Sequence, residues 1–539
     1  MPEEDRKIRY LPNDWIRPLT PLYLVSRLGR RPIIFYLKRT LRVARRSIPT
    51  IEILALGWLL LLTLLAASSS FRGVSPIDAR TNDPLATSDV VLETPPAAIV
   101  VEPLSALATI IVGAPDYRVA AISTACWLLA GSVLFYGMSR RHTGSYFRIA
   151  NSCIFALGLT LSFAIYLCAF ALVQLPSWFL AAKDPGSTIA DLHSHTIASH
   201  DGIATLDENL NYHGARGYNV VAITEHFSKY WRSNPCRLGS NATPGGTICG
   251  VEIPVGSLAA HQGYLLLLGI PPDQPLLHGL LSDYESGRLA GGLQGFVASV
   301  HDMGGAIIAL SYQLNTKAVD LLARAGVDGF EIANFGHPDI SEELKSALLT
   351  AQTVHHVALV ASSDWHGWGG FGRTWTLLTA DASMSGTRSE KVIQILRSRD
   401  AGRIIPVVSQ VMGRPTLLRG IFAPFIETIR YARGLSPYAL ASWWIWMFMW
   451  LGVGRYLRRN GYHVGRCFAG AILMILGGGL LIRSSGLLRI WMMGAPFPFP
   501  LEIAAYGCAV GIVSVSLACA CFWRSSEVNV KKRAAEQIL

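Results

Sequence analysis

The chain concentrates metal-binding side chain types in one short region. Residues 191–226 contain five histidines and three aspartates. The region includes Asp-Leu-His-Ser-His-Thr at 191–196, His-Asp-Gly at 200–202 and Thr-Glu-His at 224–226. Because successive side chains of a strand alternate between its faces, His193 and His195 point to the same side. Two imidazoles on one face, with carboxylates nearby, can chelate a divalent metal ion.

Similar side chains stand at the ends of apolar runs further along the chain. His226 follows the run 220–223, and Asp364 and His366 follow the run 359–361. Because the carboxyl ends of parallel strands converge on one mouth, we expect these side chains to meet there. Imidazole and carboxylate ligands suit zinc, manganese or iron. The sequence therefore predicts a divalent-metal site.

The elements that must position these residues alternate between strand and helix. Short apolar runs predict buried parallel strands at 220–223, 264–268, 306–310, 330–333 and 359–361. Helical patterns lie between several of them, at 206–216, 289–303, 317–325 and 341–355. This alternation indicates an α/β barrel or an open α/β sheet.

Long apolar runs flank this region on both sides. The mean hydropathy is +0.35, and 51% of the residues are hydrophobic. Six runs are long enough to span a bilayer, at 51–70, 119–138, 150–173, 437–454, 467–483 and 501–523. The region 185–410 lacks such a run and holds 12 of the 14 histidines, so it is predicted to be a soluble domain. A further segment, 97–114, is apolar except for Glu102. We expect it to lie along the membrane surface or to form a re-entrant segment.

The distribution of Lys and Arg predicts the orientation. The first 50 residues carry 12 Lys+Arg against 4 Asp+Glu, which accounts for +8 of the net charge of +11. Beside a membrane span, such a tail is typical of a cytoplasmic segment that contacts anionic lipid, and we expect no nucleic-acid partner. Further basic loops fall on the same side if all six spans cross. We therefore expect a bacterial inner-membrane protein with cytoplasmic termini and the domain 185–410 outside the cytoplasm.

These runs predict six segments. They are a basic cytoplasmic tail (1–50), a transmembrane region of about three helices (51–182), the soluble domain (185–410), an interfacial linker (411–436), a second transmembrane region of about three helices (437–523) and a second basic cytoplasmic tail (524–539). Within the soluble domain, Cys236 and Cys249 can form a disulfide if it faces an oxidising compartment, and two unpaired thiols are the alternative.

Taken in order, the motifs of the soluble domain resemble those of the PHP (polymerase and histidinol phosphatase) domain. The resemblance covers about residues 186–405. It rests on Asp-Leu-His-Ser-His-Thr, the following Asp-Gly, Ile-Thr-Glu-His, Gly-Val-Glu-Ile, His261 and Ser-Asp-Trp-His. It implies a distorted (β/α)7 barrel, here inserted between two groups of transmembrane α-helices. It also implies two or three divalent ions (Mn, Zn or Fe) and a phosphorylated substrate, a phosphate ester that is hydrolysed by a metal-bound hydroxide with no further catalytic residue.

The resemblance implies a role for each metal ligand. The first metal would be held by His193, His195, Glu252 and Asp364. A second would be bound by His261 and bridged by Glu252. A third would be held by Asp201, His226 and His366, with His200 as a rival to Asp201.

The chain departs from the family pattern after the predicted strand 306–310. The family commonly has a histidine followed by proline there, whereas this chain has Ser311 and Tyr312. The second metal is therefore expected to be weakly held, completed by a neighbour such as Asn315, or absent. Arg373, in a glycine-rich segment, is a candidate clamp for a substrate phosphate, and a solvated loop arginine is the alternative.

Several features have no motif support or leave the function open. We interpret the remaining histidines of the domain as structural or surface residues, namely His213, His278, His301, His337, His355 and His356.

Two rival functions are a PHP-like module that binds a phosphorylated ligand without turnover and a membrane transport or assembly protein. Few charges lie within the predicted spans, which argues against transport. The sequence does not indicate the oligomeric state.

Overall fold

A computed structural model describes residues 50–69, 74–86, 89–139, 145–227, 236, 246–255, 263–271, 274–338, 340–369, 372–381, 383–460, 462 and 464–538. Its contacts divide the chain into two compact units, Met1–Leu61 and Leu62–Leu539. The second unit contains every described strand and every described helix after α2 (Thr50–Ser68). The predicted tail 1–50 lies outside the described residues except for Thr50, and His261 also lies outside them.

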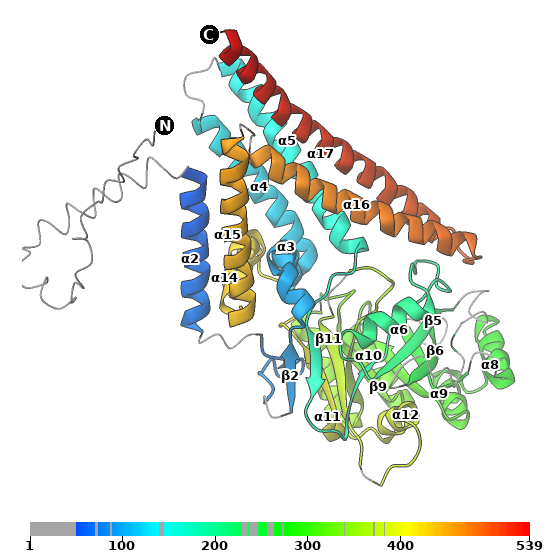
Figure 1. The fold of residues 1–539 in the computed structure, drawn as a ribbon. Coiled ribbons are helices and arrows are strands. Elements are labelled where there is room, and N and C mark those ends of the chain that lie inside the picture. Colours follow the sequence, from blue (N-terminus) through cyan, green and yellow to red (C-terminus); the bar gives the residue numbers. More distant parts are fainter. Residues whose placement is uncertain are drawn as a thin grey trace, which may run out of the picture. The chain divides into compact units, whose positions relative to one another are not determined.

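All six apolar runs predicted to cross a membrane form helices. Their bounds are α2 (Thr50–Ser68), α4 (Tyr117–Ser139), α5 (Ser145–Leu172), α15 (Pro437–Arg459), α16 (Val464–Met492) and α17 (Phe499–Ile538). In the described part of the chain, α4, α5, α16 and α17 contain a stretch long and apolar enough to cross a membrane. α2 is apolar but shorter, and α15 carries tryptophans and arginines that lower its mean hydropathy. Helices α16 and α17 lie side by side (Figure 1).

Two other segments of the helical region also form helices. The segment 97–114 forms helix α3 (Pro96–Val112), which contains Pro103. Its Glu102 is buried and accepts a hydrogen bond of 2.8 Å from Tyr431 Oη. At the other end of the chain, α17 continues through the residues that were expected to form a separate tail.

The predicted domain 185–410 contributes nine strands to a curled sheet of ten, and β1 (Ile77–Asp78) comes from the preceding part of the chain. In spatial order the ten strands are β1, β12 (Ile404–Val408), β11 (Thr374–Thr379), β4 (Ser187–Asp191), β5 (Val220–His226), β6 (Thr247–Pro254), β7 (Tyr264–Leu268), β8 (Ala306–Leu310), β9 (Gly329–Asn334) and β10 (Ala358–Ser362). A separate antiparallel pair consists of β2 (Val90–Glu93) and β3 (Phe179–Ala182). The five predicted strands are present: β7 and β8 have the predicted bounds, and the other three differ from theirs by one to three residues.

The sheet curls so that its edge strand β10 meets β11. Thr376 Oγ1 donates to Ala361 O and Thr374 Oγ1 donates to Ser362 O, each at 2.8 Å. Strands β4, β5 and β6 are mutually parallel, as are β8, β9 and β10, and the other pairs are antiparallel. The α/β class is therefore confirmed, whereas the ten strands of mixed direction do not confirm the (β/α)7 arrangement.

Strand β7 was expected to be parallel, and this prediction is wrong. It pairs antiparallel with both β6 and β8. A parallel connection needs a crossover of a dozen or more residues, and only residues 255–263 separate β6 from β7. The chain therefore returns directly beside β6 in the opposite direction.

Alternate side chains of the strands pack on opposite faces of the sheet. On β7, Leu265 and Leu267 pack toward the outer helices, whereas Leu266 and Leu268 pack inside the curl. The outer helices are α8 (Pro275–Glu285), α9 (Gly292–Asp302), α10 (Thr316–Ala325) and α11 (Glu342–His355). Helix α12 (Arg388–Ser398), which precedes the short 3-10 helix η2 (Ala401–Arg403), packs in the inner cluster. The inner face is thus filled by apolar residues away from the strand ends where polar residues gather.

Helix α6 (Leu206–Gly214) begins at a capping box that also contacts the helical region. Glu208 N donates to Thr205 Oγ1 at 3.2 Å, and Thr205 N donates to Glu208 Oε2 at 3.1 Å, so two otherwise unpaired backbone donors are satisfied. The other oxygen of Glu208 accepts a 2.6 Å hydrogen bond from Arg483 on α16. The loop before α6 is therefore tied to a candidate membrane helix.

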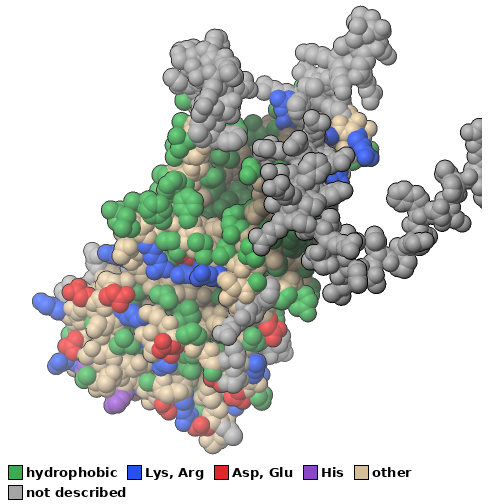
Figure 2. Space-filling view, turned by 90° about the vertical axis from the view of Figure 1, so that its left-hand side faces the viewer, with side chains coloured by type: hydrophobic (Ala, Val, Ile, Leu, Met, Phe, Trp, Pro, Cys, Tyr) green, Lys and Arg blue, Asp and Glu red, His purple; other side chains and the backbone are tan. Residues whose placement is uncertain are grey.

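The predicted linker 411–436 contains two short helices, α13 (Leu417–Ile421) and α14 (Ala423–Arg433). Leu417, Leu418 and Phe425 are exposed on them. On the face shown in Figure 2, hydrophobic side chains cover the helical part, a row of Lys and Arg follows, and both signs of charge mix beyond it. This order is typical of a protein surface that passes from lipid through headgroups to water.

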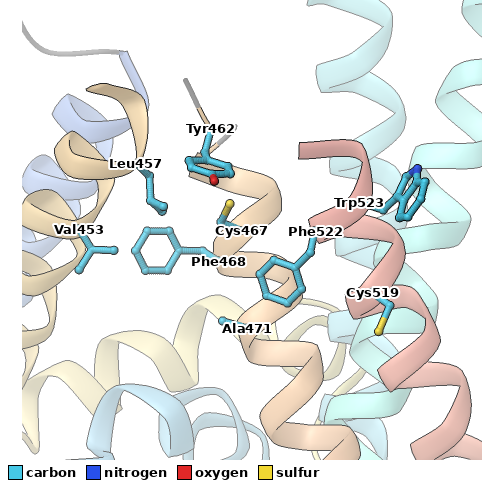
Figure 3. Close-up of a pocket in the computed structure, with 9 residues that line it drawn as sticks. All are labelled: Val453, Leu457, Tyr462, Cys467, Phe468, Ala471, Cys519, Phe522 and Trp523. Atoms are coloured by element: carbon cyan, nitrogen blue, oxygen red, sulfur yellow. The ribbon is translucent and has the colours of Figure 1, made fainter. Parts of the chain in front are cut away.

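Near the α15–α16 connection, three helices line an open apolar pocket of about 700 Å³ (Figure 3). Phe468 of α16 and Phe522 of α17 line it, together with Val453 and Leu457 of α15. Because apolar and aromatic side chains dominate this lining, the pocket suits packing of hydrocarbon rather than acid–base or metal chemistry.

Candidate metal centre

Seven side chains that can bind metal meet where the strands of the curled sheet end. They are His193 and His195 after β4, Asp201 in the following loop, His226 at the end of β5, Glu252 in β6, and Asp364 and His366 after β10. Each predicted ligand that the structure describes belongs to this cluster.

Backbone hydrogen bonds join the two loops that carry most of the ligands. Asp364 N donates to His193 O at 2.9 Å, and His195 N donates to Trp365 O at 2.8 Å. Ser194 and Trp365 form a parallel bridge between them. Because this segment is extended, the imidazoles of His193 and His195 turn to the same side, as predicted.

The first group of ligand atoms is buried. His193 Nε2 lies 3.2 Å from Asp364 Oδ1 and 3.3 Å from Glu252 Oε2. His195 Nε2 lies 3.4 Å from the same Asp364 oxygen and 3.3 Å from the same Glu252 oxygen. Two imidazole nitrogens and two carboxylate oxygens therefore face one another, which is a suitable ligand set for one transition-metal ion.

The second group lies toward the exposed edge of the cluster. Asp201 Oδ1 is 3.3 Å from both His226 Nε2 and His366 Nε2, and these two nitrogens are themselves 3.3 Å apart. His200 Nε2 is 3.9 Å from Asp201 Oδ2. Asp201 thus lies between the histidines, whereas its rival His200 stands at the rim and could still join the group.

Glu252 lies between the two groups. Its Oε2 is 3.0 Å from His226 Nδ1 as well as 3.3 Å from the first group's two Nε2 atoms. Its other oxygen, Oε1, accepts a 3.1 Å hydrogen bond from Tyr312 Oη. The carboxylate is therefore placed to bridge ions in the two described groups. The expected bridge to a metal on His261 falls outside the described residues.

Two buried polar atoms of the cluster indicate that it is suited to bind a divalent cation. His195 Nε2 and Asp201 Oδ1 are buried, and neither has a hydrogen-bond partner in the described part of the chain. Buried polar atoms are normally hydrogen-bonded or bound to a cation, because leaving them unpaired is costly. Both atoms belong to sets of three ligand atoms that lie within 4.8 Å of one another. A metal ion in each group would satisfy them.

The pKa values of the histidines differ because their neighbours differ. Burial, reinforced by the charges of His366 and His226, lowers the pKa of His195 to about 3. Burial also acts on His226, but the carboxylates of Asp201 and Glu252, which lie beside its two ring nitrogens, outweigh it and raise the pKa of His226 to about 10. His195 is therefore a neutral ligand at neutral pH, whereas His226 must lose one proton before one of its ring nitrogens can bind a metal ion.

The carboxylates of the cluster are held in the ionised form. Burial favours the neutral acid of Glu252, but hydrogen bonds from His193 and His226 outweigh it and keep the pKa of Glu252 well below its usual range. For Asp364, burial is likewise outweighed, chiefly by the charge of His193, so the pKa of Asp364 is also lowered. The carboxylates are thus ready to bind a cation.

Glu331 is a member of the site that the sequence analysis missed. It lies on β9 with its side chain fully buried, and its Oε1 is 3.2 Å from His193 Nδ1. Its Oε2 accepts a 2.7 Å hydrogen bond from Asn334 Nδ2. A carboxylate on the far nitrogen of a metal-binding histidine fixes the ring and its tautomer. In the sequence, the indication of this role was a single acidic residue between Phe330 and Ile332 in an otherwise apolar run.

Two further buried networks hold the ligand loops in place. Asp191 Oδ1 accepts from His193 N at 3.2 Å and Ser363 N at 3.0 Å, and its Oδ2 lies 2.7 Å from His213 Nε2. His213, interpreted from sequence as structural or surface, is fully buried and structural. Glu225 accepts hydrogen bonds from Thr196 Oγ1 (2.5 Å) and Ser199 Oγ (2.6 Å), which fixes the turn that leads to Asp201.

The backbone of Asp364 is held in an uncommon conformation. Its φ is +52°, in the left-handed region that side-chain-bearing residues seldom adopt. The hydrogen bond from Asp364 N to His193 O and that from Trp365 N to Ser363 Oγ (3.2 Å) fix this turn. Local strain of this kind is typical of positions where a side chain must be aimed at a site.

The structure does not bring Arg373 to the cluster. Its side chain is buried, with its guanidinium 4.6 Å from the ring centre of Trp178, and it donates to Ser409 Oγ and Thr109 O at 3.5 Å. It is therefore neither the predicted clamp at the metal ligands nor a solvated loop arginine. By contrast His337, which had no motif support, lies at the edge of the cluster, with Nε2 3.8 Å from Asp364 Oδ2 and its ring stacked on Tyr312.

Comparisons with known proteins were made for the whole chain. No family model matches it, and no curated protein matches it. Among solved structures, a protein described as a metal-dependent phosphoesterase from Bifidobacterium adolescentis is similar with 17% identity and a TM-score of 0.28, covering 39% of this chain and 96% of its own. An amidohydrolase from Chromobacterium violaceum, solved with sulfate and no metal, has 16% identity and a TM-score of 0.24 over 33% of this chain and 87% of its own. PsfC from Pseudomonas syringae has 14% identity and a TM-score of 0.29 over 46% of this chain and 98% of its own. Likeness at this level decides nothing about the reaction, so the function must be argued from the side chains.

Proposed function

We propose that the chain is a membrane-anchored, metal-dependent phosphoesterase with a PHP-like domain. The observation that carries the proposal is the convergence of three imidazoles on the carboxylate of Glu252, with a fourth imidazole beside them on Asp201. His193, His195 and His226 each place a ring nitrogen within 3.3 Å of Glu252 Oε2. His366 completes the second group through Asp201 at 3.3 Å. Adjacent groups of this composition are suited to two ions that act together on one substrate.

The protein's own residues would supply binding and orientation. Divalent ions held here would activate water for attack on phosphorus and neutralise charge on the phosphoryl oxygens. His193 and His195 hold the buried ion, aligned by Glu331 and by Ser199 Oγ, which lies 3.0 Å from His195 Nδ1. The second group is more exposed and would be the one that meets the substrate. The ring orientations are set before substrate arrives, which reduces the cost of reorganisation.

The number and kind of ions form part of the proposal. The described residues provide two groups, and a third ion would need His261 together with Glu252 Oε1. That oxygen accepts a hydrogen bond from Tyr312, which stands where the family commonly has proline after its histidine. We therefore propose two tightly held ions, with a third weakly held or absent. Nitrogen and carboxylate ligands favour Mn, Zn or Fe.

The location is also proposed from physical features. Four helices can cross a bilayer by length and composition, and the basic row in Figure 2 adjoins the apolar part. Cys236 and Cys249 are joined by a disulfide with their Cα atoms 5.5 Å apart. Disulfides persist in oxidising compartments, which supports placing the domain outside the cytoplasm of a bacterial inner membrane.

A second candidate is a module that binds a phosphorylated ligand without turnover. The hydrogen bond from Tyr312 to Glu252 favours it, because it occupies an oxygen that a third ion would need. Two ions are sufficient for in-line displacement, so we rank this candidate below the hydrolase.

The experiment is metal analysis of the purified full-length protein in detergent, followed by turnover of a panel of phosphomonoesters and phosphodiesters. We expect about two tightly held equivalents per chain, loss of metal in His193→Gln, and hydrolysis that depends on metal. His278→Gln, on α8 and outside the cluster, is the matched control. A folded protein that binds no Mn or Zn would overturn the proposal. Metal binding without turnover would favour the binding module, and turnover of amides alone would overturn the substrate class.

A further inference from the structure

Among the described ligands, exposure is greatest at the edge formed by Asp201 and His200. The side chains of His193 and His195 are fully buried, whereas those of Asp201 and His200 are 38% and 62% exposed. Exposure therefore increases from the first group to the second and then to His200. This gradient favours approach of a substrate phosphate from the edge formed by Asp201 and His200, which we call the open edge.

This open edge lies against the connection between α16 and α17. The ring of Phe497, in that connection, lies 6.3 Å from the ring of His200. Trp368 Nε1 donates to Asp201 O at 3.4 Å, and its ring packs edge-on against Phe499, the first residue of α17, at 5.5 Å. The ligand Asp201 is thus separated from a candidate membrane helix by one aromatic side chain.

The loop that carries Asp201 shares its core with the candidate membrane helices. Ile203 is fully buried in a cluster with Leu480 and Leu487 of α16 and Ile165 of α5. Arg483 of α16 donates to Ile203 O at 3.3 Å. Burial of this kind fixes the open edge relative to these helices rather than leaving it on a free loop.

Three candidate membrane stretches end at this edge. The stretch in α5 ends at Leu172, α16 ends at Met492, and the stretch in α17 begins at Phe499. Just beyond α5, Gly369 N donates to Ala171 O at 2.7 Å, which ties the loop after His366 to the end of that helix. Because apolar stretches of this length end near the edge of the hydrocarbon core, a bilayer around these helices would have its headgroups at the level of the open edge.

The connection also exposes apolar side chains beside the site. Met492 and Met493 are each 66% exposed, and Trp491 is 39% exposed. Exposed methionines and a tryptophan at the end of an apolar helix are typical of the membrane–water boundary, where they contact lipid.

We infer that the site acts on a phosphate ester carried by a membrane lipid, whose acyl chains stay in the bilayer beside the α16–α17 connection. This inference rests on the proposed phosphoesterase function and names its substrate class. The phosphoryl group reaches the second group of ligands past Phe497, while the hydrocarbon remains among the apolar side chains of α16 and α17. A free, water-soluble ester has the same reacting group but lacks the contact with the bilayer.

The test compares lipids that differ only in chain length. Full-length protein in nanodiscs is loaded with Mn and given dioleoyl or dihexanoyl phosphatidate, and dioleoyl or dihexanoyl phosphatidylglycerol, with the short-chain forms below their micellar concentrations. We expect kcat/KM to be at least about tenfold higher for the long-chain member of one pair, because sharing a surface raises the effective concentration. In Phe497→Ser the long-chain to short-chain ratio should fall, whereas Leu276→Ser, an exposed site on α8, should leave the ratio unchanged.

A second measurement does not depend on turnover. Native mass spectrometry of the detergent-solubilised protein should show retention of a dioleoyl difluoromethylene-phosphonate analogue, and weaker retention in Phe497→Ser. Equal or faster hydrolysis of the short-chain esters, with no retained analogue, would overturn the lipid inference and leave the phosphoesterase standing. Hydrolysis of neither member of any pair, together with no turnover in the soluble phosphoester panel, would overturn both.

Discussion

Glu331 Oε1 lies 3.2 Å from His193 Nδ1, and both side chains are fully buried. The other nitrogen of His193 faces Glu252 and Asp364. The ring is therefore held between a supporting carboxylate on one side and the ligand cluster on the other. For Glu331 itself, burial raises the pKa above its usual range, although the charge of His193 and the hydrogen bond from Asn334 act in the opposite direction.

This pair yields a first prediction. Glu331→Gln retains the shape of the side chain but loses its charge, so His193 should be a poorer metal ligand. We expect metal affinity to fall by about 10- to 100-fold, as is usual when the partner of a metal-binding histidine is lost. Competition with a chromophoric chelator measures the change. Glu343→Gln, on the exposed face of α11, is the control, and equal affinities for wild type and Glu331→Gln would contradict the assigned role.

Two substitutions of Asp364 separate the effect of its charge from the effect of its backbone conformation. Asparagine tolerates a positive φ, so Asp364→Asn should fold like the wild type yet lose metal from the first group. Asp364→Ala should lose metal and in addition lower the free energy of unfolding by roughly 1–2 kcal/mol, since alanine is disfavoured at φ +52°. Thermal unfolding and metal content of the two variants separate these effects. Full metal content in Asp364→Asn would show that its carboxylate is not a ligand.

The contrast between His226 and His195 predicts a pH dependence. His226, with a pKa of about 10, carries a proton between pH 7 and 9 in the metal-free protein, whereas His195, with a pKa of about 3, does not. Metal must displace the proton, so affinity should rise with pH by about tenfold per unit for each proton released. His226→Gln should reduce this slope by about one, while His195→Gln should weaken binding without changing the slope.

The same proton affects the metal-free fold. Because the pKa of His226 is raised from 6.5 to about 10, its contribution to stability is complete below about pH 6.5 and is lost as the pH rises through 10. Metal-free protein should therefore unfold more easily at pH 10 than at pH 7, and His226→Gln should show a smaller difference between the two. If metal binding had the same pH slope in wild type and in His226→Gln, the proton displaced by metal would not be that of His226.

Arg483 links α16 to the loop that carries Asp201. Its guanidinium contacts Glu208 Oε1 at 2.6 Å and Ile203 O at 3.3 Å. In Arg483→Gln we expect faster hydrogen exchange in residues 197–208, because the loss of hydrogen bonds to a charged group costs about 1.5–3 kcal/mol locally. Arg489→Gln, further along the same helix, should leave this exchange unchanged. Unaltered exchange in Arg483→Gln would mean that the loop is held by its apolar contacts alone.

The disulfide provides a test of compartment. Peptide mapping of natively expressed protein without reduction should recover Cys236 and Cys249 in one cross-linked pair. Membrane-impermeant thiol reagents should label these cysteines in spheroplasts only after reduction. Two free thiols in native protein would remove this support for the extracytoplasmic placement.

Much of the site could be predicted because its ligands recur at the ends of apolar runs. A five-residue apolar run such as 306–310 locates a buried strand, and the polar residues next to such runs mark the strand ends. The direction of a strand is not encoded in its own apolar run, which is why β7 was assigned wrongly. The direction of β7 was indicated only by the short connection that joins it to β6.

Other features depended on contacts that are remote in sequence. Glu331 lies in a strand with no motif around it, and its role appears only when β9 comes beside His193. Arg373 follows glycines in a loop near the ligands, but loop composition does not indicate that its side chain turns toward Trp178. Tyr312 was noticed as a departure, whereas its hydrogen bond to Glu252 required the folded sheet.

Arg483 contacts the loop around Asp201, and Phe499 packs on Trp368, which is hydrogen-bonded to that loop. These contacts also affect the order in which the site is completed during synthesis. Synthesis proceeds from the N-terminus, so all seven described metal ligands leave the ribosome before α16 begins at Val464. Until the last helical hairpin is inserted, Glu208 has no arginine to meet and Trp368 has no Phe499 to pack on. The open edge of the cluster is therefore completed last, and a chain that stalls before α16 and α17 are made would carry the candidate metal ligands without these contacts.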